Sequence, residues 1–324
     1  MAEAAVVEKK IRKKTKKEPI RDKITLKNIK AQKQLIFMSF PFLLYIILFN
    51  YVPAIGWVMA FQDFKPAKGL FDQTWVGFKH FNFLFSDSSF LRVLRNTLAM
   101  SFINLILGFV SAIILALLLN EIKSMFFKRT VQTISYLPHF LSWVIAAGIV
   151  ANVLSTEDGI INVLLMNFGL IESPILWLGK GEYFWGIVGA AGVWKSVGWN
   201  TIIYLAAMSA INPALYEAAD IDGANRYHKM WYITLPSIKS TFVILLIMSI
   251  GNILNAGFEV QYLLGNGMVM DYSETIDIFV LKYGISQFNF SLATAAGMFK
   301  TVVSVILIYS ANLVAKKLGE EQLI

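Results

Sequence analysis

Six long apolar stretches constrain the fold of this 324-residue chain more than any other feature. A hydrocarbon layer about 30 Å thick requires roughly 20 apolar residues as a helix to cross it, and each stretch reaches that length. The stretches run approximately from Leu35 to Phe61, Thr97 to Leu119, Val131 to Leu154, Phe184 to Ile211, Thr241 to Tyr262 and Leu292 to Val314. Lipid offers no partner for backbone N–H and C=O groups, so these stretches are predicted to be helices. The expected fold is all-α, a polytopic membrane protein whose six-helix domain covers residues 34–324.

Composition supports lipid as the solvent of this chain. Hydrophobic residues make up 56% of the sequence and charged residues only 15%, a balance that one water-soluble core of this size could hardly bury. The chain has no cysteine, which excludes both a disulfide framework and a thiolate zinc site.

The first 33 residues form a separate, basic segment. They contain twelve Lys or Arg and four acidic residues, so the net charge of this segment equals the net charge of +8 of the whole chain. A basic tail can serve as a nucleic-acid arm, but one that directly precedes a long apolar run is more typical of a cytoplasmic end facing anionic lipid. We therefore expect no nucleic-acid partner. With six crossings, both termini are expected in the cytoplasm.

The link between the fourth and fifth stretches, residues 212–240, is too polar to cross a bilayer but carries helix signals of its own. Asn212 is a favoured N-cap residue, and Pro213 suits the first helical position, where a missing N–H costs nothing. Gly223 can supply a left-handed turn. The link is predicted to be a short helix, a turn and a second short helix that ends before Pro236, on the cytoplasmic side.

This link resembles the EAA loop of bacterial ABC-importer permeases. The family pattern is Glu-Ala-Ala, three residues, Gly, nine residues, then Ile-x-Leu-Pro. The chain matches it without departure at Glu217, Ala218, Ala219, Gly223, Ile233, Leu235 and Pro236. The resemblance implies that residues 212–236 dock in a groove of an ATPase subunit and transmit its nucleotide-driven closure. The small Ala side chains suit such close approach, while the alternative is an amphipathic loop helix with a coincidental Ala pair.

A looser resemblance covers most of the rest of the chain. The segments Trp75 to Leu98, Gly159 to Asn162 and Val193 to Ser196 are similar to carbohydrate-uptake permeases of that superfamily. The basic amino terminus and the run Tyr136 to Val144 look like the LplB-like polysaccharide and oligosaccharide permeases. The resemblance implies a sugar substrate, a second homologous permease subunit, two ATPase subunits and an extracytoplasmic solute-binding protein, assembled in a bacterial cell membrane.

The sequence offers little support for other function classes. It contains no Gly-x4-Gly-Lys-Ser/Thr phosphate loop, so ATP and Mg are expected on the partner ATPase and no cofactor on this chain. A membrane-embedded enzyme is an alternative, but no catalytic constellation or metal-ligand spacing among the three histidines can be defended. A channel or secondary transporter would have no evident use for the EAA loop. An importer of a non-sugar solute remains a further alternative.

Polar residues in the fifth stretch are candidates for the substrate path. Asn252, Asn255 and Glu259 lie at i, i+3 and i+7, which places them on one face of a continuous helix. Amides and a carboxylate can bind sugar hydroxyls, and the aromatic face of Phe258 suits the C–H side of a sugar ring. The alternative is that both asparagines hydrogen-bond neighbouring helices.

Lys195 and Trp194, near the middle of the fourth stretch and one turn before Trp199, are two further candidates for the substrate path. A lone ammonium in a membrane is costly, so it is expected to reach water or to be paired, with Glu259 as one partner. A structural or gating pair and direct contact with substrate both remain open. Lys300 in the sixth stretch poses the same question.

Four further polar or helix-bending positions stand out. Pro138 lies early in the third stretch, where it is expected to bend the helix. His139 after it is interpreted as an interfacial polar residue rather than a metal ligand. Asn152 and Asn200 are weaker candidates for the substrate path.

Overall fold

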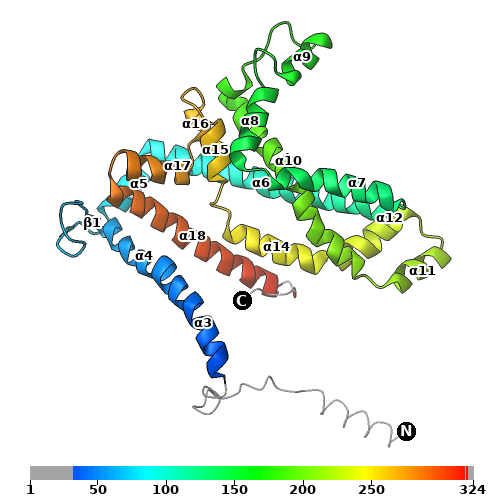
Figure 1. Cartoon of the computed structure of the whole chain (residues 1–324), viewed down its shortest axis with the longest axis horizontal. Helices are drawn as coiled ribbons and strands as arrows, with labels where there is room; N and C mark the ends of the chain where they lie inside the picture. The colour runs from blue at the N-terminus through cyan, green and yellow to red at the C-terminus, as the bar shows by residue number, and fades with distance from the viewer. Residues whose placement is uncertain (1–31, 318, 320–324) are drawn as a thin grey trace, which may run out of the picture. The chain divides into compact units, whose positions relative to one another are not determined.

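The computed structural model describes residues 32–317 and 319, and these form an almost entirely helical protein (Figure 1). The basic segment that precedes residue 32 lies outside the described residues, so its predicted place in the cytoplasm stays a prediction. The chain divides into two compact units, Met1–Gly56 and Trp57–Ile324. The all-α expectation is confirmed.

The described part of the first unit is one apolar helical run. It consists of α3 (Lys33–Ile46), the π-turn η1 (Ile47–Tyr51) and α4 (Val52–Ala54). Pro53 is the second residue after the π-turn. A proline ring clashes with the carbonyl four residues before it, and the wider i to i+5 turn accommodates the ring without ending the helix.

The second unit contains a short β-hairpin near its start, and its other described elements are helices. Its first elements are η2 (Ile55–Phe61), which crosses the boundary between the units, β1 (Gln62–Asp63), β2 (Thr74–Trp75), α5 (Lys79–Ser86), α6 (Ser88–Glu121), α7 (Met125–Tyr136), η3 (Leu137–Phe140), α8 (Trp143–Val153), α9 (Ile160–Asn167) and η4 (Trp177–Gly179). The remaining elements are α10 (Gly181–Ser209), α11 (Pro213–Ile221), α12 (Arg226–Lys229), η5 (Met230–Thr234), α13 (Leu235–Ser237), α14 (Lys239–Gly251), α15 (Phe258–Leu264), α16 (Met270–Ser273), α17 (Ile276–Leu281), η6 (Lys282–Ser286) and α18 (Phe290–Lys317). The two strands pair antiparallel, with Gln62 opposite Trp75.

Membrane-spanning length is present in three single helices and three bent pairs of the described chain. The single helices are Lys33–Phe61, Ser88–Glu121 and Phe290–Lys317. The bent pairs are Met125–Phe140 with Trp143–Val153 at 106°, Gly181–Ser209 with Pro213–Ile221 at 69°, and Arg226–Ser237 with Lys239–Gly251 at 54°. If each pair is one span, the chain has up to six, in agreement with the predicted number.

The third span is broken rather than merely bent. Pro138 lies in the 3₁₀ turn η3. The two residues that follow η3, Leu141 and Ser142, have extended backbone conformations. The hydroxyl of Ser142 then accepts a hydrogen bond from Ile145 N and caps α8. The expected bend at Pro138 is confirmed, but the prediction of one continuous helix from residue 131 to 154 is wrong.

The fifth span is also shorter than predicted. Helix α14 ends at Gly251, and the chain is unwound until α15 begins at Phe258. Gly257 has a φ of +87°, which is outside any right-handed helix and is easily reached only by a residue without Cβ. Hydropathy extended the helix across this glycine, and the predicted continuous helix from residue 241 to 262 is therefore wrong.

The middle of the second unit is built on the pair α6 and α10, which lie side by side (Figure 1). The Thr201 hydroxyl lies 3.2 Å from the carbonyl of Ala112 and connects the two helices. A buried cluster around Ala112, Ala116, Tyr204, Met208 and Ile238 joins them to the start of α14. This arrangement places residues of all three helices around one hollow.

Candidate functional site

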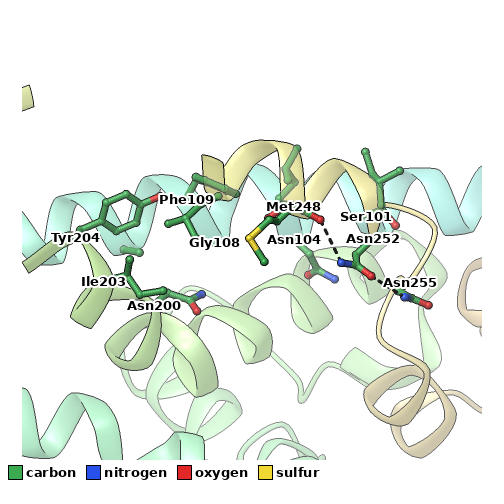
Figure 2. A pocket seen from close by; sticks show the side chains of 15 residues that line it. Ser101, Asn104, Gly108, Phe109, Asn200, Ile203, Tyr204, Met248, Asn252 and Asn255 are labelled. Atoms are coloured by element: carbon green, nitrogen blue, oxygen red, sulfur yellow. Dashed lines mark hydrogen bonds between the residues drawn. The ribbon is translucent and has the colours of Figure 1, made fainter. Parts of the chain in front are cut away.

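A cavity of about 430 Å³ lies between α6, α10, α14 and the unwound segment after α14 (Figure 2). Its polar lining consists of Ser101, Asn104, Asn200, Tyr204, Ser249, Asn252 and Asn255. Its apolar lining consists of Leu105, Gly108, Phe109, Ala112, Ile203, Leu245, Met248 and Ile253. The lining residues carry amides, hydroxyls and two aromatic rings, and none of them is charged.

The end of α14 determines where the cavity amides point. Asn252 is the C-cap residue, and its side-chain amide donates to the carbonyl of Met248 over 3.1 Å. Its Oδ1 accepts from the amide of Asn255 over 3.4 Å (Figure 2). On the opposite wall, the Asn104 amide lies 3.4 Å from the carbonyl of Ala256 in the unwound segment. The break in the helix thus turns two asparagines toward the hollow and gives a third a main-chain partner.

Two hydroxyl groups of the lining have no protein partner within the described chain. Tyr204 Oη and Ser101 Oγ are both buried and accept or donate no hydrogen bond there. An unpaired buried polar group costs about 1–3 kcal/mol, which bound water or a hydroxyl-bearing ligand can offset. These two oxygens are covered by neighbouring atoms, so the exposed amides of Asn252 and Asn255 are the polar groups open to a ligand, and the hydroxyls become available only if the wall shifts.

The structure brings together only part of the predicted substrate path. Asn252 and Asn255 line the cavity, whereas Phe258 and Glu259 lie on the separate helix α15 and do not. The prediction that Asn252, Asn255 and Glu259 share one helical face is wrong, because the chain unwinds between them. Lys195 and Trp194 also lie outside the lining.

Sequence reasoning overlooked several lining residues. Asn200, a weaker candidate, lines the cavity, while Asn152 does not. Asn104 was missed, although it is a polar side chain inside the second apolar stretch and met the same criterion as Asn252. Tyr204 carried no such signal, since tyrosine is common in apolar helices.

The two lysines of the spans are paired, but not as the sequence suggested. Lys195 is 7% exposed, and its ammonium donates to the main-chain carbonyl of His139 over 2.8 Å. The suggested pair with Glu259 is wrong, because Glu259 follows the break in the fifth span and is exposed. Lys300 forms an ion pair with Asp277 of α17.

The link that follows α10 is a helical hairpin closed by a glycine. Asn212 Oδ1 accepts from Ala214 N over 3.1 Å, and Pro213 is the first residue of α11. At the end of α11, Gly223 has a φ of +76° and donates to Asp220 O, and Ala224 N donates to Ala219 O over 2.8 Å. This pair of bonds is the Schellman arrangement that ends many helices. The predicted N-cap, first helical residue and left-handed turn are confirmed.

The second arm of the hairpin differs from the prediction in one respect. It does not end before Pro236 but continues through the π-turn η5 and α13 to Ser237. As at Pro53, the wide turn before the proline relieves the ring clash.

Side-chain contacts hold the two arms of the hairpin together. Tyr216 Oη lies 2.9 Å from Thr234 Oγ1, and Lys229 forms an ion pair with Asp220. The first arm leaves Glu217 and Ala218 exposed, and Ile221 is 88% exposed. Ile233 and Leu235 are half-buried on the second arm. The hairpin is thus braced internally while one acidic and apolar face stays open.

Comparison with known proteins identifies the family. Residues 104–320, more than half of the chain, match the family described as the inner membrane component of binding-protein-dependent transport systems. The chain belongs to this family. It is therefore a membrane component of a transport system rather than an enzyme, as the EAA-loop resemblance implied.

Two curated relatives from Bacillus subtilis (strain 168) cover nearly the whole chain. The polygalacturonan/rhamnogalacturonan transport system permease protein YteP is 45% identical over 99% of this chain and 98% of its own length. Protein LplB is 41% identical over 91% of this chain and 92% of its own length. The predicted LplB-like subgroup of this permease family is confirmed.

Two solved structures of bacterial ABC transporters are also similar. One transporter is involved in the import of the acidic polysaccharide alginate, and its matching chain has a TM-score of 0.83 and 38% identity. This match covers 90% of the present chain and 98% of the other. The second is an alginate transporter in complex with a periplasmic protein bound to an alginate pentasaccharide. Here the TM-score is 0.85 and the identity 37%, over 92% of the present chain and 99% of the other.

Proposed function

We propose that the chain is a permease subunit of an ATP-driven importer for an oligosaccharide or a polysaccharide-derived sugar. The course of α10 carries this proposal. This helix contributes Asn200 and Tyr204 to the cavity, and it ends at Ser209, directly before the hairpin of residues 212–236. A movement imposed on the hairpin therefore reaches the cavity wall through one continuous helix.

The chemistry of the cavity suits a sugar. Amides and hydroxyls can donate to and accept from sugar hydroxyls, and the rings of Phe109 and Tyr204 offer apolar faces for C–H groups. The volume of about 430 Å³ is within the range of small-molecule sites, roughly 300–1,000 Å³. The names of the relatives, which refer to polygalacturonan, rhamnogalacturonan and alginate, support the same substrate class.

The proposed assembly contains a second homologous permease, two ATPase subunits and an extracytoplasmic solute-binding protein. The ATPases bind ATP and Mg, and the exposed face of Glu217, Ala218 and Ile221 docks against one of them. Nucleotide-driven closure at this face shifts the population between inward-open and outward-open states. The assembly lies in a bacterial cell membrane with both termini of this chain in the cytoplasm, in agreement with the basic segment of residues 1–33.

Two cavity variants test the proposal in the assembled transporter. Asn255→Ala and Tyr204→Phe each remove one hydrogen-bonding group worth about 1–3 kcal/mol, or roughly 5-fold to 150-fold in binding. Both are expected to lower sugar uptake and sugar-stimulated ATP hydrolysis together in proteoliposomes. Asn152→Ala is the matched control, because this exposed amide of α8 lies outside the cavity. Its uptake is expected to equal that of the parental protein.

The competing explanation is that these polar groups serve only helix packing. In that case Asn255→Ala lowers thermal stability while uptake per assembled complex stays unchanged. Tyr204→Phe, which removes an unpaired buried hydroxyl, then raises stability without any cost in transport. Unchanged uptake in either variant, with its change in thermal stability, would contradict the assignment of the cavity as the sugar site.

A further inference from the structure

A buried lysine lies at the break in the third span. The ammonium of Lys195 on α10 binds the carbonyl of His139 in η3 and lies 5.3 Å from the ring of Trp143 on α8. The carbonyl end of a helix carries partial negative charge, so a cation is stabilised there. Lys195 thus contacts both halves of the broken span from one neighbouring helix.

The choice of partner distinguishes Lys195 from two other lysines of the unit. Lys282 pairs with Glu274 over 3.0 Å, and Lys300 pairs with Asp277. Lys195 instead uses a main-chain carbonyl, and no carboxylate of residues 32–317 lies within ion-pair distance of it. A buried ammonium in a membrane is expensive, and here its charge is directed at backbone that has left the helical hydrogen-bond ladder.

Two more contacts connect the same turn of α10 to the first half of the third span. The ring of Trp199 stacks on His139, with centroids 4.5 Å apart and planes 4° from parallel. A Cβ at Gly198 would lie 2.2 Å from the carbonyl oxygen of Ser135, so the backbones of α10 and α7 touch there. Residues 195–199 therefore hold α7 and η3 by charge, ring stacking and close backbone packing.

We propose that Lys195 is a positioning residue that fastens α7 and η3 to α10 through the carbonyl of His139. Through Trp143 the same ammonium also holds the start of α8, whose Ala147 packs in one buried cluster with Phe184 and Val188 of α10, so α8 belongs to the same body. The consequence for transport rests on the proposed function, because the same helix α10 carries Asn200 and Tyr204 and leads into the hairpin. Movement of the hairpin carries α7, η3 and the cavity wall together.

Distance measurements between spin labels test this body directly. The chain has no native cysteine, so labels can be placed at Thr133 on α7, Ile202 on α10 and Val144 on α8, which are all exposed. In the assembled transporter, the Thr133 to Ile202 distance is expected to be equal without nucleotide and with ATP. The Val144 to Ile202 distance is expected to stay equal as well, because α8 is held to α10 by Trp143 and Ala147.

Variants at the contact then test the role of the charge. Lys195→Met is expected to broaden the distance distribution between Thr133 and Ile202, and Lys195→Arg is expected to keep it narrow. Sugar carried per ATP hydrolysed should fall about tenfold in Lys195→Met, the loss expected for one charge-assisted hydrogen bond, with an unchanged KM for the loaded binding protein. Trp194→Phe, a change at the neighbouring position, is the control with no expected effect. If Lys195→Met fails to assemble, Trp199→Leu tests the same contact through His139.

Two results would overturn the inference. One is a Thr133 to Ile202 distance that shifts between the nucleotide states of the parental protein. The other is a distribution in Lys195→Met, or in Trp199→Leu, as narrow as the parental one. A transporter that shows the expected distances and hydrolyses ATP but carries no sugar would instead contradict the proposed function, and the inference about Lys195 would stand.

Discussion

Gly223 allows a quantitative test of the hairpin, because its substitution changes backbone strain alone. Its φ is +76°, and a Cβ built at this position meets no atom within 4 Å. A left-handed conformation costs a residue with a Cβ roughly 1–2 kcal/mol, and a β-branched side chain is among the least tolerant. This cost lowers the population of the observed turn conformation, relative to its alternatives, roughly 5-fold to 30-fold. Gly223→Val is expected to lower uptake by at least that factor.

The assay is ATP-driven sugar uptake in proteoliposomes, together with copurification of the ATPase. Gly223→Asn is the matched control, because asparagine tolerates the left-handed region, and its uptake should stay close to the parental value. Gly223→Ala should lie between the two. Membrane insertion should be equal in all three, because the turn is predicted to lie outside lipid. Parental uptake and ATPase binding in Gly223→Val would refute the argument that this turn geometry couples the subunits.

Three further predictions follow from named contacts. The ion pair of Asp220 and Lys229 is partly exposed, so a double-mutant cycle should give a coupling energy of only about 0.2–1 kcal/mol. Each single charge reversal should therefore lower coupled uptake slightly, and the variant with both charges swapped should restore it. Asn162 is buried and bonds Ser155 O, Ile175 N and O, and Trp177 Nε1, so Asn162→Ala should lower the melting temperature of the complex, whereas Asn167→Ala should not. A protease added outside intact cells should leave residues 1–33 uncut, and cleavage there would contradict the predicted orientation.

Local signals made the hairpin predictable. Asn212, Pro213 and Gly223 each act within a few residues of chain, through a side-chain cap, a missing N–H and a left-handed φ. Such signals depend little on the rest of the fold, and all three positions are as expected. The extension of the second arm past Pro236 was missed, because a π-turn before a proline leaves no simple sequence signature.

The cavity and the lysine contacts were only partly predictable, because they depend on packing between distant segments. Hydropathy identified the fifth stretch as apolar but could not distinguish a continuous helix from one that unwinds before Gly257. Once it unwinds, Asn252 and Asn255 turn toward α6 and α10, and Glu259 leaves that face. The partner of Lys195 is a backbone carbonyl freed by the break after Pro138, and a main-chain group of this kind cannot be singled out by side-chain type.

The central claim is that sugar passes through the cavity lined by Asn252 and Asn255. Cysteine at position 252, in a chain without native cysteine, measures this most directly in the assembled transporter. A water-soluble maleimide is expected to label it in at least one nucleotide state, and transported sugar is expected to slow that labelling. Cysteine at position 152, outside the cavity, should label at the same rate with and without sugar. Labelling at position 252 that never occurs, or that sugar leaves unchanged in every nucleotide state, would contradict the account.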